Sequence, residues 1–273
     1  MLSCSRRERM NSAWDDLSHT AAAPRLVLLP GLDGTGKLFA EFLEALDLGS
    51  GAQVVPYPPD IPLGYDELEA LVRAALPTQG RFVLLGESFA GPLAIRIAAH
   101  PPPGIVGLIL CVTFASNPYP YLGWARGLAA FLPLKSLPRW LRAPLMWGSA
   151  SPSKAPRQSE RAMAGVAAGV IRRRIAALLA VDETAALGRV SVPTLVLRAT
   201  GDRVVSEAAT MKIMRGIGHA RRVDVDGPHL LLKTRPQECA DAVLKFIREE
   251  SAVPSSRGLS RGALQDPERR ARR

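Results

Sequence analysis

A membrane span requires a long apolar run and a secretory signal requires a shorter one near the N-terminus, and this chain of 273 residues has neither. Its longest apolar run, residues 104–115, is shorter than the roughly 18 residues that a membrane-spanning helix needs. Residues 1–23 contain no apolar core of the kind found in signal peptides. We therefore expect no membrane span and no secretory signal, and we interpret residues 1–23 as an irregular N-terminal leader.

Cysteine is scarce as well. The three cysteines, Cys4, Cys111 and Cys239, are odd in number and far apart in the sequence. Such a set indicates neither a disulfide framework nor a zinc site. It is typical of a protein in a reducing compartment, so we expect a cytoplasmic location.

Acidic residues are outnumbered, because Lys and Arg total 35 while Asp and Glu total 25, a formal net charge of +10. A strongly basic chain can bind nucleic acid, but no zinc-finger, RNP-like or helix-turn-helix pattern accompanies the excess here. The excess lies mostly in residues 114–191, with 11 basic and 3 acidic side chains, and in residues 251–273, with 6 and 2. We expect no nucleic-acid partner and interpret residues 251–273 as a disordered basic tail.

Short apolar stretches alternate with longer amphipathic ones along most of the chain. Strands are expected at residues 25–30, 52–57, 81–85, 105–112, 194–198 and 221–225, and helices at 37–48, 65–76, 89–100, 206–216 and 236–249. This alternation predicts an α/β fold with a mostly parallel sheet of about six strands flanked by helices. Its core would comprise residues 24–115 and 187–250.

Residues 116–186 interrupt the alternation. They contain three of the four tryptophans and no clear strand, and helices are expected near 120–132, 137–147, 158–169 and 170–181. We interpret this segment as a helical cap inserted after the fourth strand. It would lie over the carboxyl ends of the strands, where open parallel sheets hold their sites.

A candidate nucleophile follows the third expected strand, in the sequence Gly86-Glu87-Ser88-Phe89-Ala90-Gly91. A serine at the apex of a sharp strand-to-helix turn needs very small residues two positions away on each side. Gly86 and Ala90 meet this need, although the last position of the usual pentapeptide is glycine. We expect Ser88 to be a catalytic nucleophile.

A serine nucleophile needs a base, which in turn needs an orienting acid. Asp202 and His229 follow the fifth and sixth expected strands, so the order Ser88, Asp202, His229 would bring all three to one edge of the sheet. Asp226, three residues before His229, is an alternative acid.

Acyl transfer also needs N–H donors for the developing oxyanion. Phe89 follows the nucleophile and opens a helix, so its N–H is expected to be available. A second donor is expected in the loop of residues 31–36 after the first strand, where Leu32 is the candidate. The alternative for this glycine-rich loop is phosphate binding, although its spacing does not match a P-loop.

Together the segments PGLDGTG, GESFAG, VPTLVLRATGDRVV and DGPH resemble the α/β-hydrolase superfamily in order and spacing. The short helical cap resembles that of small bacterial carboxylesterases, including pimeloyl-carrier-protein methyl ester esterases. The resemblance implies an α/β-hydrolase fold and a serine carboxylesterase that cleaves a small-molecule ester of small to medium acyl chain through an acyl-enzyme on Ser88. It implies no metal and no organic cofactor.

Other functions stay open because one fold hosts many chemistries. They include serine acyl transfer, thioester hydrolysis, cofactor-free haloperoxidase chemistry and non-catalytic binding. Within the cap, the apolar residues Trp124, Leu128, Met146 and Trp147 would line an acyl pocket or simply pack the cap onto the core. The basic residues Arg139, Arg142, Arg172, Arg173 and Arg174 would dock an acidic carrier protein or simply face solvent.

Overall fold

The structure is a computed structural model that describes residues 23–121 and 162–251. Its centre is a sheet of six strands in the order β2-β1-β3-β4-β5-β6, and every neighbouring pair is parallel. The strands are β1 (Arg25–Leu29), β2 (Ala52–Val54), β3 (Phe82–Glu87), β4 (Ile105–Cys111), β5 (Thr194–Ala199) and β6 (Arg221–Val225). The sequence prediction of a parallel six-stranded sheet is confirmed.

Helices connect successive strands. The longer ones are α2 (Ala40–Leu46), α3 (Tyr65–Ala75), α4 (Gly91–Ala99), α7 (Ala168–Ala180), α9 (Glu207–Gly216) and α11 (Pro236–Ser251). The shorter ones are α8 (Thr184–Leu187), α10 (Leu231–Thr234) and the 3-10 turns η1 (Lys37–Phe39), η2 (Gly49–Gly51) and η3 (Ser88–Ala90). The sequence prediction missed α8 and α10, because four residues are too few to show helical periodicity.

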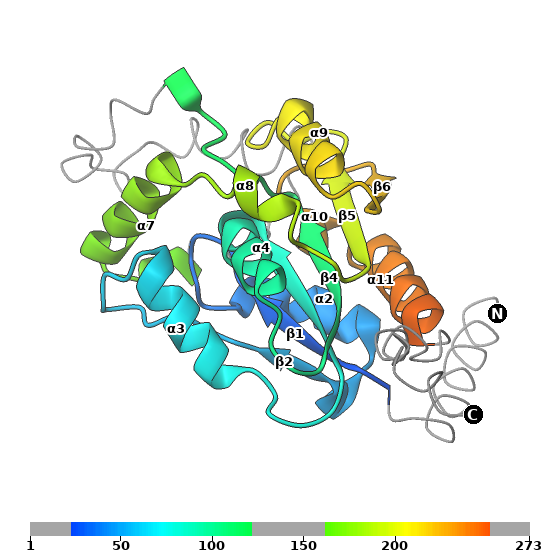
Figure 1. The fold of residues 1–273 in the computed structure, drawn as a ribbon. Coiled ribbons are helices and arrows are strands. Elements are labelled where there is room, and N and C mark those ends of the chain that lie inside the picture. The colour runs from blue at the N-terminus through cyan, green and yellow to red at the C-terminus, as the bar shows by residue number, and fades with distance from the viewer. Residues whose placement is uncertain (1–22, 122–161, 252–273) are drawn as a thin grey trace, which may run out of the picture.

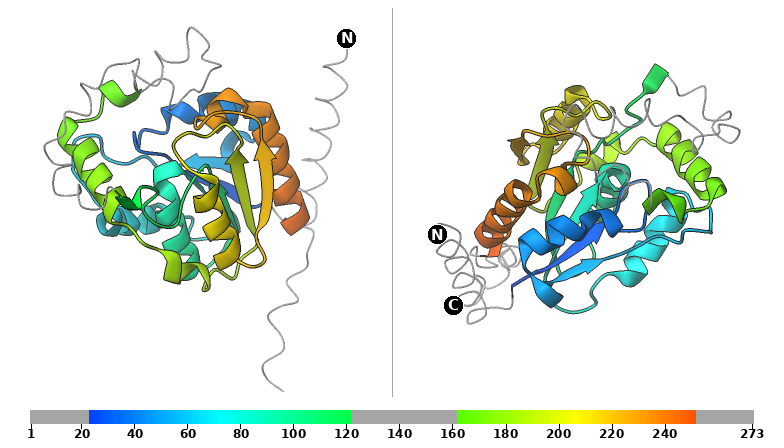
Figure 2. Two further views of the ribbon diagram at one scale, coloured as in Figure 1. Left: turned by 90° about the horizontal axis from the view of Figure 1, so that it is seen from above. Right: turned by 180° about the vertical axis from the view of Figure 1, so that it is seen from behind.

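The helices cover the two faces of the sheet separately, so the molecule has three layers (Figures 1 and 2). On one face α3, α4, α8 and α9 pack over a core that includes the fully buried Leu68, Leu93 and Ile213. On the other face α2, α10 and α11 pack over a second core that includes Phe42 and Val243. Apolar burial on both faces explains why the central strands β3 and β4 are almost wholly apolar.

Helix α7 belongs to the inserted segment between β4 and β5 and lies beside α3 (Figures 1 and 2). The expected break between residues 169 and 170 is wrong, because α7 runs unbroken from Ala168 to Ala180. Its boundary lies at Ala167, which is extended and donates its N–H to the Pro59 carbonyl over 2.7 Å. The expected helices at 120–132 and 137–147, the leader up to residue 22 and the tail from residue 252 lie outside the described residues.

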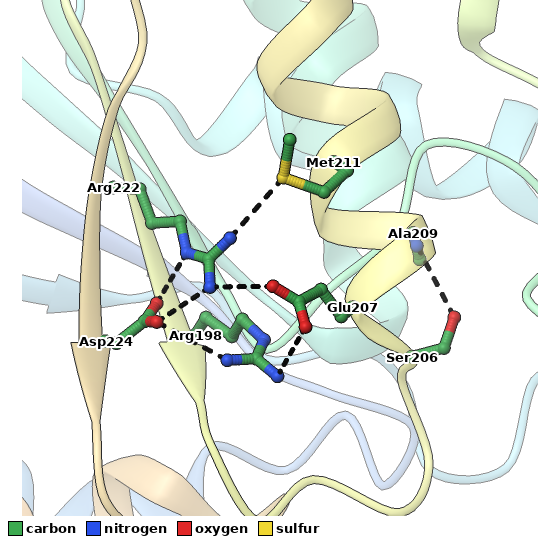
Figure 3. Close-up of polar contacts among 7 residues, drawn as sticks. All are labelled: Arg198, Ser206, Glu207, Ala209, Met211, Arg222 and Asp224. Carbon is green, nitrogen blue, oxygen red and sulfur yellow. Dashed lines mark hydrogen bonds and ion pairs between the residues drawn. The ribbon is translucent and has the colours of Figure 1, made fainter.

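The edge strand β6 is tied to its neighbours by four charged side chains (Figure 3). Arg222 of β6 contacts Asp224 on its own strand and Glu207 at the start of α9, with nitrogen–oxygen distances of 2.6 and 3.0 Å. Arg198 of β5 contacts the same two carboxylates at 3.4 and 3.5 Å. Charge at an exposed edge also discourages pairing with another chain.

In the described part of the chain no helix has the length and apolar character to cross a bilayer.

Candidate active site

Ser88 occupies the sharp turn between β3 and α4. Its φ is +50°, a left-handed conformation that costs a non-glycine residue about 1–3 kcal/mol unless its surroundings hold it. The surroundings do so here, because the Thr113 hydroxyl donates to the Ser88 carbonyl and the Tyr65 hydroxyl donates to the Phe89 carbonyl over 2.8 Å. The Tyr65 ring also stacks on the Phe89 ring. The turn is therefore held from two sides.

The small residues around Ser88 are required by close packing. A Cβ atom on Gly86 would lie 2.7 Å from the Ala94 Cβ and 2.9 Å from the Ala90 carbonyl oxygen. A Cβ atom on Gly91 would lie 1.8 Å from the Thr113 hydroxyl oxygen. Gly86 thus allows α4 to approach β3, as the sequence predicts. Gly91 has a separate role that the sequence did not indicate, namely the approach of Thr113 from the end of β4.

The structure brings Ser88, His229 and Asp202 together. The Ser88 Oγ lies 2.8 Å from His229 Nε2, and His229 Nδ1 lies 2.8 Å from Asp202 Oδ2. The histidine and aspartate side chains are 3% and 4% exposed, so water competes little for these hydrogen bonds. With Nδ1 protonated, Nε2 can accept the serine proton, so the arrangement can transfer a proton from hydroxyl to imidazole.

The alternative acid, Asp226, is engaged elsewhere. Its Oδ1 accepts a hydrogen bond from the Thr200 hydroxyl over 3.0 Å, and its carbonyl oxygen accepts one from Arg235 Nε over 2.8 Å. The Asp202 Oδ1, in contrast, accepts hydrogen bonds from the N–H groups of Val204 and Val205 over 2.7 and 2.9 Å. These bonds fix the carboxylate so that its other oxygen faces the imidazole.

The first-strand loop forms a tight turn beside Ser88. The Gly34 N–H donates to the Gly31 carbonyl over 3.0 Å, so Leu32 is the first central residue of a four-residue turn. A Cβ atom on Gly31 would lie 3.7 Å from the Ser88 Cβ. Among the described residues no acceptor is found for the Leu32 N–H. Phe89 is the second residue of η3, before α4 begins, where an N–H lacks a helical partner.

Two buried carboxylic acids lie behind this turn, and the sequence analysis assigned no role to either. Glu87 is 5% exposed, and burial, with a smaller contribution from nearby Asp33, raises its pKa to about 8. A hydrogen bond from the Gly31 N–H partly opposes this shift. The Asp33 carboxylate accepts from the Thr35 N–H over 2.9 Å. The sequence does contain a signal for Glu87, because this charged residue ends the otherwise apolar strand FVLLGE.

Both interpretations of the basic residues Arg172, Arg173 and Arg174, carrier docking and a solvated face, require exposed side chains, and this expectation is wrong for Arg174. Its side chain is fully buried, since it shares the inward face of α7 with Val170 and Ile171. Arg173 is exposed and pairs with Glu67 at 3.6 Å. The spacing of Arg174, three and four residues after two buried apolar residues, could have revealed its direction.

Several candidate residues lie outside the described residues: the apolar cap residues Trp124, Leu128, Met146 and Trp147, and the basic residues Arg139 and Arg142. Within residues 23–121 and 162–251, no group of three or more His, Cys, Asp or Glu side chains is arranged to hold a metal ion.

Cys111 and Cys239 are buried free thiols, and burial raises the pKa of each.

Known proteins with similar sequences and structures carry the same fold. The family model described as the alpha/beta hydrolase family matches residues 12–242. The chain is 28% identical to "Putative carbamate hydrolase RutD" of Rhizobium rhizogenes, across 85% of this chain and 95% of that one.

Two solved structures show the fold likeness. An enol-lactonase from Burkholderia xenovorans has a TM-score of 0.70 at 20% identity, covering 84% of this chain and 93% of that one. A bromoperoxidase from Bacillus anthracis has a TM-score of 0.71 at 17% identity, with the same coverage. The family model spans most of the sequence and the parallel sheet agrees with it, so this chain belongs to the alpha/beta hydrolase family.

Proposed function

We propose that this chain is a serine carboxylesterase that hydrolyses carboxylic esters of small to medium acyl chain through an acyl-enzyme on Ser88. The observation that carries the proposal is the unbroken hydrogen-bonded series from Ser88 through His229 to Asp202, with 2.8 Å at each link. Ser88 Oγ attacks the ester carbonyl while its proton passes to His229 Nε2. The imidazolium then protonates the leaving alcohol, and water activated by the same imidazole releases the acid.

In this mechanism the tetrahedral intermediate carries a negative oxygen that needs fixed N–H donors. The proposed donors are the backbone N–H groups of Phe89 and Leu32. The turn of residues 31–34 beside Ser88 supports the choice of Leu32. Loss of one such donor typically costs about 2.7–4 kcal/mol of transition-state stabilisation.

The proposal includes a helical cap over residues 116–186 and a cytoplasmic location. The cap is supported by α7 and α8, which lie between β4 and β5. The location is supported by the free thiols of Cys111 and Cys239. We do not propose that an acidic carrier protein binds here, because Arg174 is buried and Arg173 is paired with Glu67.

A second candidate substrate class is carbamates. It is favoured by the likeness to a protein named as a carbamate hydrolase over 95% of that protein's length. A carbamate carbonyl accepts the same attack by Ser88 and the same oxyanion donors, so the site would need no additional catalytic group. Esters remain the first choice because an ester carbonyl is more electrophilic than a carbamate carbonyl.

The test is a panel of p-nitrophenyl esters of graded chain length, with p-nitrophenyl carbamates beside them. We expect ester turnover by the wild type and a loss of at least about 10⁴-fold in Ser88→Ala. Ser206→Ala, which removes only the cap at the start of α9, is the matched control and should keep full activity (Figure 3). Retained turnover in Ser88→Ala would refute the proposal, and faster carbamate than ester turnover would favour the second class.

Added alcohol and thiol acceptors distinguish hydrolysis from acyl transfer in the same assay. Because water must reach the acyl-enzyme in a hydrolase, we expect free acid as the main product. A predominance of transferred acyl product would instead identify an acyltransferase.

A further inference from the structure

We propose that Arg174 is a positioning residue for the oxyanion turn: from helix α7 of the inserted segment, its guanidinium holds the backbone of Leu32 and Asp33 in place beside Ser88. This inference rests on the proposed function, because it assigns a catalytic purpose to the turn. It adds a connection between the segment that would cover the substrate and the donor that would stabilise the transition state.

The contacts of Arg174 are directed at the turn. Its Nη1 donates to the carbonyl oxygens of Leu32 and Asp33 over 3.0 and 2.8 Å, and its Nη2 donates to that of Pro58 over 3.0 Å. The guanidinium lies over the Tyr57 ring, 5.4 Å from its centre. One rigid group thus joins α7 to two loops that are more than 100 positions away in sequence.

The packing around Arg174 is close. A Cβ atom on Gly34 would lie 2.4 Å from Arg174 Nη1, and Gly34 has a φ of +70°. Only glycine fits both the turn conformation and the guanidinium at this position. The glycine of the first-strand loop therefore makes room for an arginine from a distant helix.

Every carbonyl oxygen of the turn has a donor. The Gly31 oxygen accepts from Gly34, the Leu32 and Asp33 oxygens accept from Arg174, and the Gly34 oxygen accepts from the Tyr57 N–H over 2.8 Å. Two carbonyls held by one planar group fix the peptide planes on both sides of Asp33, and so the backbone of Leu32 at its carbonyl end. This constraint keeps the Leu32 N–H available for a reacting oxyanion rather than turned toward a carbonyl of its own loop.

The charge of Arg174 is also unusual. Among the described residues no ion pair with its guanidinium is found and its Nε has no hydrogen-bond partner, although the nearby Asp33 charge favours its cationic form. A buried cation without a direct ion pair is costly for stability. The same charge favours a negative oxygen developing on the far side of the turn, since electrostatic interactions are strong in a water-poor site.

The test compares Arg174→Gln and Arg174→Lys with Arg173→Gln, which removes a charge from the same helix without reaching the turn. We expect Arg174→Gln to lower kcat by about 10- to 100-fold with KM within about twofold, because the effect appears only in the transition state. Arg174→Lys should recover part of the loss, since an ammonium keeps the charge but lacks the planar fork that holds two carbonyls at fixed angles. Arg173→Gln should match the wild type.

A readout on pH separates positioning from damage to the base. The acid side of the kcat/KM profile should fall at the same pH in Arg174→Lys as in the wild type, because Ser88 and His229 are untouched. A higher KM with unchanged kcat would overturn the proposal and identify Arg174 as a substrate-binding residue. A lower melting temperature with unchanged kcat would also contradict the proposal, because Arg174 would then contribute only to stability.

Amide hydrogen exchange over residues 29–38 tests the inference without any substrate. Exchange should be faster in Arg174→Lys than in Arg173→Gln and the wild type, because lysine lacks the planar fork that fixes both carbonyls of the turn. Unchanged exchange in Arg174→Lys would refute the inference even where the wild type proves to be an esterase. Faster exchange in Arg174→Lys, together with a wild type that cleaves no ester, would leave the connection intact and refute only the proposed function. If Arg174→Gln does not fold, the kinetics and the hydrogen exchange are both measured on Arg174→Lys.

Discussion

The two oxygens of Asp202 have different partners, and this difference explains how Asp202 can select the tautomer of the His229 imidazole. Oδ1 accepts two backbone N–H groups, whereas Oδ2 faces His229 Nδ1. The backbone fixes the carboxylate, and the carboxylate then selects the imidazole tautomer with a proton on Nδ1. Only that tautomer leaves Nε2 able to accept the Ser88 proton.

Asp202→Asn should therefore disable the base while keeping the shape of the site. The amide oxygen would stay on the N–H groups of Val204 and Val205, so the amide nitrogen would face Nδ1 and force the wrong tautomer. We expect kcat to fall by up to about 10⁴-fold. Steady-state kinetics on an ester substrate checks this, with Asp226→Asn as the matched control.

Asp226→Asn should change kcat by less than about threefold, because Asp226 contacts Thr200 and Arg235 rather than His229. Equal losses in the two variants would mean that the acid has been misassigned. The sequence favoured Asp202 and left Asp226 as an alternative, since the contacts of each acid depend on how two loops meet across the ends of β5 and β6.

At the scale of elements, the active-site turn depends on the close approach of α4, β3 and the residues that follow β4. Gly91 begins α4 in ordinary helical geometry, with φ of −60° and ψ of −50°. An alanine there would be free of backbone strain, so any penalty comes from its contact with Thr113. Thr113 in turn donates to the Ser88 carbonyl, which joins helix packing to the nucleophile.

Gly91→Ala should consequently destabilise the protein by about 1–3 kcal/mol and lower kcat, because Thr113 must move away from Ser88. Gly188→Ala is the matched control, since Gly188, directly after α8, also has right-handed helical backbone angles, with φ of −68°, and has nothing within 4 Å of an added Cβ. That control should be neutral or slightly stabilising. Chemical denaturation and kinetics of both variants provide the check, and a Gly91→Ala variant as stable as Gly188→Ala would contradict the packing argument.

Elements with a strong local pattern were predictable from the sequence, and those set by tertiary contacts were not. The strands and the longer core helices follow from apolar alternation and periodicity. The start of α7 depends on a hydrogen bond from Ala167 to Pro59, which no local pattern reveals. The spacing of Arg174 after Val170 and Ile171 indicates its inward direction, but the carbonyl groups that bind its guanidinium come from loops after β1 and β2, which no local pattern reveals.

At the scale of the whole molecule, the inserted segment is tied to the core at several points in its described part. Arg174 reaches the turn of residues 31–34, the Ala167 N–H donates to the Pro59 carbonyl over 2.7 Å, and Arg96 of α4 pairs with Glu183. The returning half of the insertion is therefore part of the framework around the site. Part of the positive charge of this region is buried, since Arg174 lies inside the fold and donates hydrogen bonds to loop carbonyls.

Global stability should depend on pH through Glu87. In the unfolded chain this carboxyl ionises near its ordinary pKa of 4.5, whereas burial raises its pKa to about 8 in the folded protein. The folded state thus retains a proton that the unfolded state has lost, so the stabilising contribution is complete below about pH 4.5 and is lost as the pH rises to about 8. Stability should fall through this window.

Glu87→Gln mimics the protonated carboxyl and should lack this loss. The difference in unfolding free energy between Glu87→Gln and the wild type should therefore shift in favour of the variant from about pH 5 to about pH 8, as measured by denaturation at several pH values. Glu44→Gln, at an exposed position on α2, is the control for changes of net charge. A difference that stays constant over this range for Glu87→Gln would contradict the assignment of a buried neutral acid.

The central claim is that Ser88 carries the acyl group, and trapping that intermediate tests it most directly. The wild type is mixed with a p-nitrophenyl ester and quenched in acid within the first turnover, and its peptides are analysed by mass spectrometry. We predict an acylated peptide containing Ser88, formed in step with a burst of p-nitrophenol and absent from Ser88→Ala. Ester turnover with an unmodified Ser88 peptide, or with the acyl group on another residue, would contradict it.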